Sequence, residues 1–162
     1  MAFSRIAIVN RGDAASRCLR AIRELRAERG TPFVAIALYT EPDARAPFVR
    51  DADEVLSLGP ALRGPRGRAP RLAYLDRARV LAALRATRAD AVWPGGGFLA
   101  EDPVFVQQLE QRDIAFIGPT SAAMRLVGNK IAAALMSSGR PSAPAPKRPM
   151  PSATIRSSSR PR

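Results

Sequence analysis

RIAIVNRGDAASRCLRAIRELRAERG, residues 5–30, contains a strand, a turn and a helix in succession. The run RIAIV at residues 5–9 is short, apolar and β-rich, and Asn10-Arg11-Gly12 follows it as a turn. From residue 15 onward apolar side chains recur at helical spacing, at Cys18, Leu19, Ile22 and Leu25. Gly30 then closes the helix. The stretch therefore predicts a βα unit, with Cys18 as a small core residue on the apolar side of the helix.

Four more apolar runs predict strands further along the chain. They span residues 33–39, 54–58, 91–93 and 114–117. Helical patterns lie between them: one begins near Asp76, one opens with the N-cap Asp102 and the first-turn Pro103, and a short one ends at Gly128. Residues 60–70 are rich in Arg, Gly and Pro and are expected to form a loop. Five strands alternating with helices predict an α/β fold with a doubly wound, mostly parallel five-stranded sheet.

The composition excludes several kinds of site. The chain has 162 residues, of which 46% are apolar, so it can hold one globular domain with its own core. Histidine is absent and there is a single cysteine, which excludes intrachain disulfides, Cys or His metal clusters and histidine-based triads. No metal site is expected. No run approaches the roughly 20 apolar residues of a membrane span and residues 1–5 lack a signal-peptide core, so we expect a cytoplasmic protein.

Residues 139–162 differ in composition from residues 1–138 and are expected to be a disordered tail behind the domain. The formal net charge is +12, and half of the excess lies in this tail, which has six basic residues, six prolines, five serines and no acidic residue. The remaining charge favours solvated helix faces. A nucleic-acid-binding basic arm is disfavoured because no aromatic side chain is interleaved for base stacking. A third interpretation is that the tail is out-of-frame translation of GC-rich DNA.

The loops after the strands are the candidate binding sites. In a doubly wound sheet, ligands bind outside the carboxyl ends of the strands, where helix N-termini offer free backbone N–H groups. The candidate loops here are residues 10–13, 94–101 and 118–121. Gly12 stands alone after the first strand, so the dinucleotide-binding fingerprint is missing, and no Walker sequence occurs. A plain Rossmann dehydrogenase is therefore disfavoured.

Five segments resemble the N-terminal domain of biotin carboxylase, in the same order and at comparable spacing. They are IAIVNRGD (residues 6–13) with the Arg-rich helix behind it, YTEPD (39–43), RDADE (50–54), PGGGFLAE (94–101), and FIGP (116–119) continuing through GNK (128–130). The resemblance covers about residues 4–138. It is closest to the biotin carboxylase portion of large acyl-CoA or pyruvate carboxylase chains, and it implies the Rossmann-like domain that precedes an ATP-grasp domain.

The resemblance implies part of an ATP-dependent ligase. In that family ATP activates bicarbonate as carboxyphosphate, and the carboxyl group passes to biotin on a carrier domain. ATP, Mg²⁺ and biotin are the implied cofactors, while the remaining carboxylase domains or subunits and a biotin carboxyl carrier protein are the implied partners, together with a homodimer. The ATP-grasp region, with its phosphate loop and metal-binding carboxylates, has no counterpart in the sequence. We therefore expect an amino-terminal fragment that is inactive alone and binds none of these cofactors tightly.

Residue by residue, the resemblance assigns few roles at the ligand site. Lys130 matches the family lysine that reaches the nucleotide phosphates, a role that suits a flexible point charge. Gly97 lies where the family's glycine loop approaches biotin, and Glu101 matches the acidic residue that closes this loop toward the biotin or bicarbonate pocket. From the residues alone, a tight turn explains Gly97 equally well. A favourable charge near a helix N-terminus is the corresponding alternative for Glu101.

Three residues of the first helix fall where the family contacts its dimer partner, namely Arg17, Arg20 and Glu24. Their spacing of three and four places them on one side of the helix. Without the resemblance, the same spacing predicts a solvated helix face.

Departures from the family pattern leave other interpretations open. Gly96 stands where the family usually has a tyrosine beside biotin, and Trp93 stands where it commonly has a histidine. One alternative is a non-catalytic interaction module, which docks on a carboxylase through the first-helix face or on an acidic partner through the basic tail. Another is a different ATP-grasp ligase, against which the segments at residues 10–12 and 97–99 argue. The sequence alone does not decide whether the chain is an enzyme.

Overall fold

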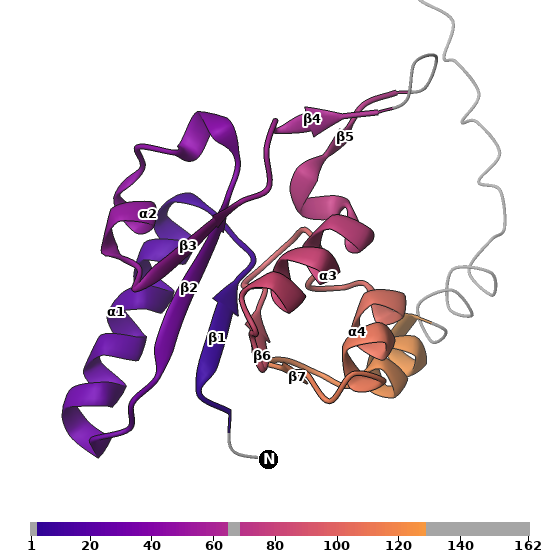
Figure 1. Ribbon diagram of the computed structural model, residues 1–162. Helices are drawn as coiled ribbons and strands as arrows, with labels where there is room; N and C mark the ends of the chain where they lie inside the picture. The colour runs from indigo at the N-terminus through magenta and orange to yellow at the C-terminus, as the bar shows by residue number, and fades with distance from the viewer. Residues whose placement is uncertain (1–2, 65–68, 129–162) are drawn as a thin grey trace, which may run out of the picture.

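A five-stranded parallel sheet forms the centre of the computed structural model, which describes residues 3–64 and 69–128 (Figure 1). In spatial order the strands are β3 (Glu54–Ser57), β2 (Val34–Tyr39), β1 (Arg5–Ile8), β6 (Ala91–Trp93) and β7 (Ala115–Phe116). Every neighbouring pair runs parallel. The strand order reverses beside β1, as in other doubly wound sheets. The predicted fold class is therefore confirmed.

The N-terminal stretch folds as the predicted βα unit. β1 leads into α1 (Gly12–Arg29), which buries one apolar side against the sheet through Ala15, Leu19 and Ile22. The helix ends where the sequence predicts: Gly30 is left-handed with φ of 63°, and its N–H donates to the Arg26 carbonyl at 3.0 Å. Cys18 is half-buried against the same cluster, as expected.

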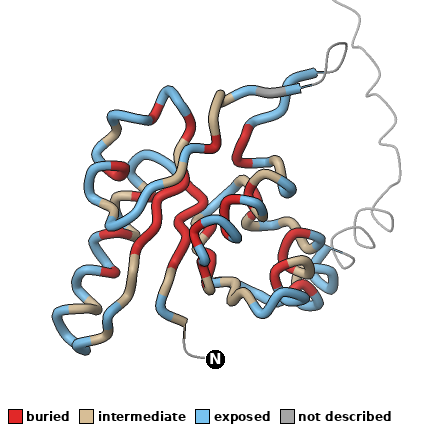
Figure 2. The backbone as a smooth tube through the Cα atoms, in the orientation of Figure 1, coloured by how far each residue is buried: buried red, intermediate tan, exposed pale blue. Residues whose placement is uncertain are grey.

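Helices cover both faces of the sheet. One face packs against α1 and α2 (Pro47–Asp51), and the opposite face packs against α3 (Arg77–Ala86) and α4 (Pro103–Glu110). Successive residues of β1 alternate between the two cores, with Ile6 and Ile8 in one and Ala7 in the other. Figure 2 shows the buried residues concentrated along the central strands β1, β2 and β6 and on parts of the helices that cover them. Burial of this apolar surface is the main source of stability.

Two predicted helix starts carry side-chain caps, of which the one at Asp102 was predicted. The Asp76 carboxylate accepts a hydrogen bond from the N–H three residues later at 3.1 Å and begins α3. Asp102 accepts from the N–H groups of Val104 and Phe105 at 3.0 and 3.1 Å and begins α4. Each such cap contributes about 1 kcal/mol. A further helix is described over residues 121–128.

Residues 60–70 are not simply a loop, which corrects the prediction from the sequence. Within this segment lies the strand β4 (Leu62–Arg63), which pairs antiparallel with β5 (Arg71–Leu72) directly after the segment. Strands of two residues are too short for an alternating pattern to show in the sequence. The short helix α2 and the 3₁₀ helices η1 (Glu41–Asp43) and η2 (Ala73–Leu75) were also not predicted. The ends of the five predicted strands differ from the observed ends by at most one residue.

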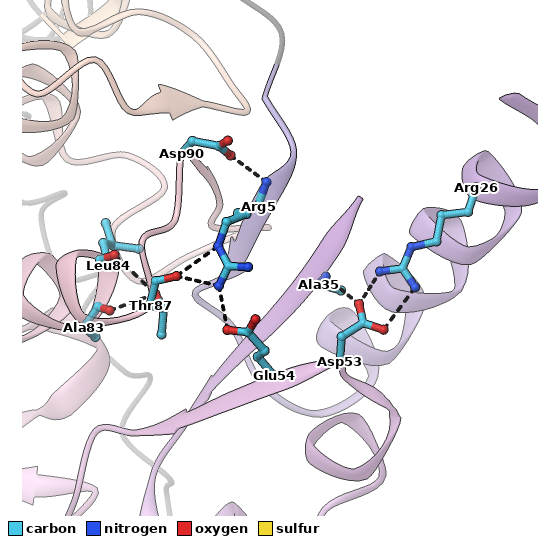
Figure 3. A network of polar contacts seen from close by, with 9 residues as sticks. All are labelled: Arg5, Arg26, Ala35, Asp53, Glu54, Ala83, Leu84, Thr87 and Asp90. Atoms are coloured by element: carbon cyan, nitrogen blue, oxygen red, sulfur yellow. Dashed lines mark hydrogen bonds and ion pairs between the residues drawn. The ribbon is translucent and has the colours of Figure 1, made fainter. Parts of the chain in front are cut away.

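Polar contacts tie the amino ends of the strands together, as Figure 3 shows. Asp90, just before β6, accepts the backbone N–H of Arg5 at 2.7 Å and that of Ser4 at 3.0 Å. The Arg5 guanidinium donates to the Thr87 carbonyl at 2.7 Å and pairs with Glu54 of β3 at 2.6 Å. The hydrogen bond with Arg5 lowers the pKa of Glu54. This network joins β1, β3 and β6 at the edge of the sheet opposite the candidate loops.

A second contact at the same edge joins α1 to the sheet. Asp53 accepts the Ala35 N–H of β2 at 2.7 Å and forms an ion pair with Arg26 of α1 (Figure 3). The hydrogen bond with Arg26 lowers the pKa of Asp53. One carboxylate therefore fixes both a strand and the helix that covers it.

Within residues 3–64 and 69–128, no helix is long and apolar enough to cross a membrane. The same residues contain no group of three or more His, Cys, Asp or Glu side chains that could hold a metal ion. The expected domain boundary after residue 138, the expected disordered tail and Lys130 all lie outside the described residues.

Candidate functional site at the carboxyl edge of the sheet

The switch point of the sheet lies between β1 and β6. From β1 the chain continues into α1 on one face, and from β6 it continues toward α4 on the other (Figure 1). The two strands end side by side, because Ile8 pairs with Trp93 and the Val9 N–H donates to the Trp93 carbonyl at 2.9 Å. Parallel sheets bind ligands preferentially at such a point. The loops at residues 10–12 and 94–99 begin there.

Asn10 connects these two loops through its side chain. It is 4% exposed, and its Nδ2 donates to the Pro94 carbonyl at 2.7 Å and lies 3.3 Å from the Gly96 carbonyl. Its Oδ1 accepts the N–H of Arg11 at 2.8 Å. The buried amide therefore has partners on both its donor and its acceptor side, as buried polar groups require. The loop after β6 is held against the loop after β1.

The three glycines of the loop after β6 differ in whether the structure requires a glycine at their position. Gly95 has φ of 63°, and a Cβ at this position would lie 2.6 Å from Asn10 Nδ2 and 2.8 Å from the Trp93 ring. Gly97 has φ of 83°, and a Cβ there would have no atom within 4 Å. Gly96 has neither a positive φ nor a close neighbour. Only Gly95 is therefore required by a close approach, while the turn itself favours glycine at position 97.

Arg11 extends the polar contacts to the end of β2. Its Nε and Nη2 donate to the two carboxylate oxygens of Asp43 at 2.9 and 2.6 Å, and Thr40 Oγ1 donates to the same carboxylate at 3.1 Å. Asp43 and Thr40 are buried, and the Arg11 side chain is 55% exposed. The Arg11 hydrogen bonds lower the pKa of Asp43 and, reciprocally, raise the pKa of Arg11. A fixed guanidinium thus remains partly open to solvent beside the switch point.

Two aromatic side chains support the glycine loop from the core. Tyr74 is buried and its hydroxyl donates to the Leu38 carbonyl at 2.9 Å. Its ring centroid lies 5.0 Å from that of Phe98, which follows the glycines. Burial raises the pKa of Tyr74, so the hydroxyl stays protonated and keeps its role as a donor. The residue is suited to support rather than to proton transfer.

The residues predicted for the biotin or bicarbonate pocket lie in the loop after β6. Gly97 and Glu101 are both exposed. The Ala100 N–H donates to the Gly97 carbonyl at 2.9 Å, which closes the turn between them. Glu101 directly precedes Asp102, the N-cap of α4, where a negative charge is also favourable for the helix. Both positions are accessible to a ligand. The turn still explains Gly97, and the nearby helix N-terminus still explains Glu101, without a ligand.

The three residues predicted for a dimer interface lie apart from this loop, along α1. Arg17, Arg20 and Glu24 are all exposed. Arg17 Nε forms an ion pair with Asp13 Oδ2 at 2.8 Å, in which both side chains are 75% exposed. The geometry is that of an accessible charged helix face. Lys130, the predicted phosphate-binding residue, lies outside the described part of the chain.

Asn10, Arg11 and Asp43 are parts of the sequence motifs, but their contacts with one another and with the glycine loop were not predicted. Asn10 and Arg11 follow the first strand directly, and Asp43 follows the second. Because the carboxyl ends of parallel strands meet at one edge, these three positions could have been grouped from the topology. The pairing of Asn10 with Gly95 could not, because it depends on the loop conformation.

The family profile described as "Biotin carboxylase, N-terminal domain" matches residues 2–124. The chain is 37% identical over 130 residues to the biotin-dependent acyl-coenzyme A carboxylase alpha3 subunit of Mycobacterium leprae, covering 80% of this chain and 20% of that protein. It is 37% identical over 142 residues to the biotin carboxylase of Haemophilus influenzae, covering 86% of this chain and 29% of that protein. These matches span most of the described sheet and its helices.

Solved structures give the same result. The pyruvate carboxylase of Rhizobium etli is similar with a TM-score of 0.67 and 34% identity, over 85% of this chain and 12% of that one. The biotin carboxylase of Campylobacter jejuni, solved as a β-γ-ATP complex, is similar with a TM-score of 0.64 and 35% identity, over 77% of this chain and 25% of that one. The chain thus spans less than a third of the length of each of these relatives. It belongs to the family of biotin carboxylase N-terminal domains.

Proposed function

We propose that this chain serves as the first domain of a biotin-dependent carboxylase, in which ATP and bicarbonate are used to carboxylate biotin. The observation that carries the proposal is the glycine loop after β6, anchored at the switch point of a domain that belongs to this family. The switch point is where a sheet of this type offers backbone groups to a ligand. The domain contributes binding surface to the reaction, and the remaining carboxylase domains or subunits contribute the ATP-binding region.

Gly97 and Glu101 are the residues proposed to face biotin or bicarbonate. Gly96 and Gly97 are exposed, and even an added Cβ at either position would meet no atom within 4 Å. A flat ring could therefore approach this backbone closely, which fits a loop that supports one side of biotin. Glu101 would add a carboxylate at the rim.

The nucleotide and its metal are proposed to bind mostly outside the described residues. Lys130 is the proposed contact to the nucleotide phosphates, because an ammonium group offers a positive charge and three donors to phosphate oxygens. Residues 3–64 and 69–128 gather no carboxylate cluster that would hold Mg²⁺. When bound, Mg²⁺ would neutralise phosphate charge. We therefore expect the isolated chain to be inactive and to bind ATP and biotin weakly.

Reconstitution tests the proposal. The chain is mixed with a carboxylase polypeptide whose own N-terminal domain has been deleted, and ADP release is followed with ATP, bicarbonate, Mg²⁺ and free biotin. We expect neither part to be active alone and the mixture to hydrolyse ATP in a biotin-dependent reaction. Glu101→Gln should reduce this activity, whereas Glu28→Gln, at an exposed position near the end of α1, should not. A mixture that forms a complex but stays inactive would overturn the proposal.

The exposed side of α1 supports a second proposal, that of an interaction module. Arg17, Arg20 and Glu24 present charged groups on one accessible helix face, which suits docking on another carboxylase subunit or on a second copy of the chain. Arg20→Glu reverses one charge without touching the core. It should weaken self-association or binding to a biotin carboxyl carrier protein or carboxylase subunit in analytical ultracentrifugation. Unchanged association in this variant would argue against α1 as the docking face.

A further inference from the structure

Asn10 is a buried polar residue at the switch point, and its side chain contacts both loops of the candidate site. It is 4% exposed, and its side-chain amide forms hydrogen bonds with Pro94, Gly96 and Arg11. We propose that Asn10 is the positioning residue of the glycine loop at residues 94–97, a role that rests on the proposed function only where biotin is concerned. It fixes the loop backbone through one amide group.

The chemistry of the contacts selects asparagine. Two carbonyl oxygens of the loop face the Nδ2 donor, while the backbone N–H of the next residue faces the Oδ1 acceptor. A primary amide fits this arrangement, because its nitrogen has two N–H donors for the two carbonyls and its oxygen is an acceptor for the N–H. An aspartate would direct a negatively charged oxygen toward the carbonyls of Pro94 and Gly96. A glutamine carries the right groups on a side chain one methylene too long for the same packing.

Gly95 provides an independent indication of the same contact. The missing side chain at this position leaves the space that the Asn10 amide uses, because a Cβ would lie 2.6 Å from Nδ2. The φ of 63° at Gly95 is a conformation that other residues rarely adopt. The side chain on one loop and the absent side chain on the other therefore form a matched pair. A change on either side should release the same loop.

Because two carbonyls of the loop point inward to Asn10, the opposite side of the loop backbone is left exposed to solvent or a ligand. Pro94 and Gly96 direct their carbonyl oxygens to Asn10, while Gly96 and Gly97 remain exposed on the outer side. The Tyr74–Phe98 pair supports the far end of the loop. Asn10 therefore acts on the ligand-facing backbone through the loop and does not itself need to touch a ligand.

Amide hydrogen exchange measured by NMR on the full chain tests this role directly. Asn10→Asp and Asn10→Ala should speed exchange at least tenfold at the Ala100 and Asp102 amides, which donate to the Gly97 and Leu99 carbonyls of the loop, beyond any change in global stability measured by urea unfolding. Gly95→Ala should release the same amides, which keeps a test available if an Asn10 variant folds poorly. The matched control is Thr87→Val, which removes the hydroxyl bonds to Ala83 and Leu84 at the opposite edge and should leave the loop amides unchanged. Loop exchange that follows only global stability would overturn the proposal.

The biotin part is tested separately in the reconstituted carboxylase. Asn10→Asp should raise the KM for free biotin about tenfold with a smaller effect on kcat, because the loop is displaced while the ATP-binding region is unchanged. Asn10→Gln should not restore the wild-type KM for biotin. A KM equal to that of the wild type would overturn the positioning role toward biotin. If even the wild-type chain shows no biotin-dependent activity while the loop amides still respond, the proposed function fails and the structural role of Asn10 stands.

Discussion

Replacing Asp43 by Asn should destabilise the chain more than the same replacement at Asp13, although each removes one negative charge. The Asp43 side chain is 10% exposed and accepts hydrogen bonds from Arg11 and Thr40. Asp13 pairs with Arg17, and both of these side chains are 75% exposed. The two variants therefore compare the loss of a buried carboxylate with the loss of an exposed one in the same domain.

The expected magnitudes follow from this difference in exposure. A hydrogen bond to a charged group contributes about 1.5–3 kcal/mol, but the half-exposed Arg11 regains hydration when it loses its partner. We therefore expect D43N to lower the free energy of unfolding by about 2 kcal/mol. The exposed Asp13 pair should contribute about 0.3–0.5 kcal/mol, with a similar share from the charge at the helix N-terminus.

Urea unfolding of the purified chain measures both values by linear extrapolation. A double-mutant cycle with Arg11→Gln isolates the pairwise contribution, for which we expect a coupling of about 1–2 kcal/mol. The reasoning would be refuted if D43N and D13N lost equal stability, or if the Asp43 and Arg11 changes were additive.

The pH dependence of the same variant gives a second test. Arg11 lowers the pKa of Asp43 in the folded chain below the value of about 3.9 that an unfolded aspartate has. The stabilisation is therefore complete above the unfolded pKa and is lost as the pH falls through the folded pKa. The difference in unfolding free energy between wild type and D43N should be constant from pH 7 to 5 and shrink toward pH 3. A difference that persists at acid pH would contradict the assignment.

Three further predictions concern the loop and the core. Gly95→Ala should cost about 2–4 kcal/mol in urea unfolding, from left-handed strain and overpacking, whereas Gly96→Ala should stay within about 0.5 kcal/mol. Tyr74→Phe should cost about 1 kcal/mol because the Leu38 carbonyl loses its donor, and a variant as stable as wild type would contradict that contact. Burial raises the pKa of Cys18 to about 12, so a disulfide reagent such as DTNB at pH 8 should label it slowly until urea unfolds the chain. Rapid labelling of the folded chain would show that the thiol is not held in the core.

The fold could be predicted because its signals are local. In residues 5–30 a β-rich run, a turn and a helical apolar stripe occur within one segment, and the helix stops at a glycine whose φ is 63°. The caps at Asp76 and Asp102 are likewise readable, because a side chain bonds to N–H groups two or three residues away. The hairpin of β4 and β5 was missed because it depends on a pairing between segments and not on a pattern within either one.

The site could be predicted only as far as its loops. The sequence indicates that residues 94–101 follow a strand and are rich in glycine, but it does not distinguish the three glycines. Gly95 is confined by Asn10, which is 85 positions away along the chain, and this confinement exists only once β1 and β6 pair. The Arg11–Asp43 pair similarly depends on β1 lying beside β2. Contacts of this kind arise from the topology, so motif spacing alone cannot assign them.

The amino and carboxyl ends of the strands are stabilised by different kinds of contact. This difference determines which substitutions the domain can accept while the candidate site keeps its geometry. At the amino edge, Asp90, Arg5 and Glu54 form several contacts among three strands, so loss of one leaves others in place (Figure 3). At the carboxyl edge, one amide at Asn10 holds the glycine loop against β1. Substitutions at the amino edge should therefore lower stability gradually and leave the loop intact, whereas a substitution at Asn10 changes the loop at once. A variant that speeds exchange of the loop amides by more than its change in global stability explains would therefore identify the residue that controls the site.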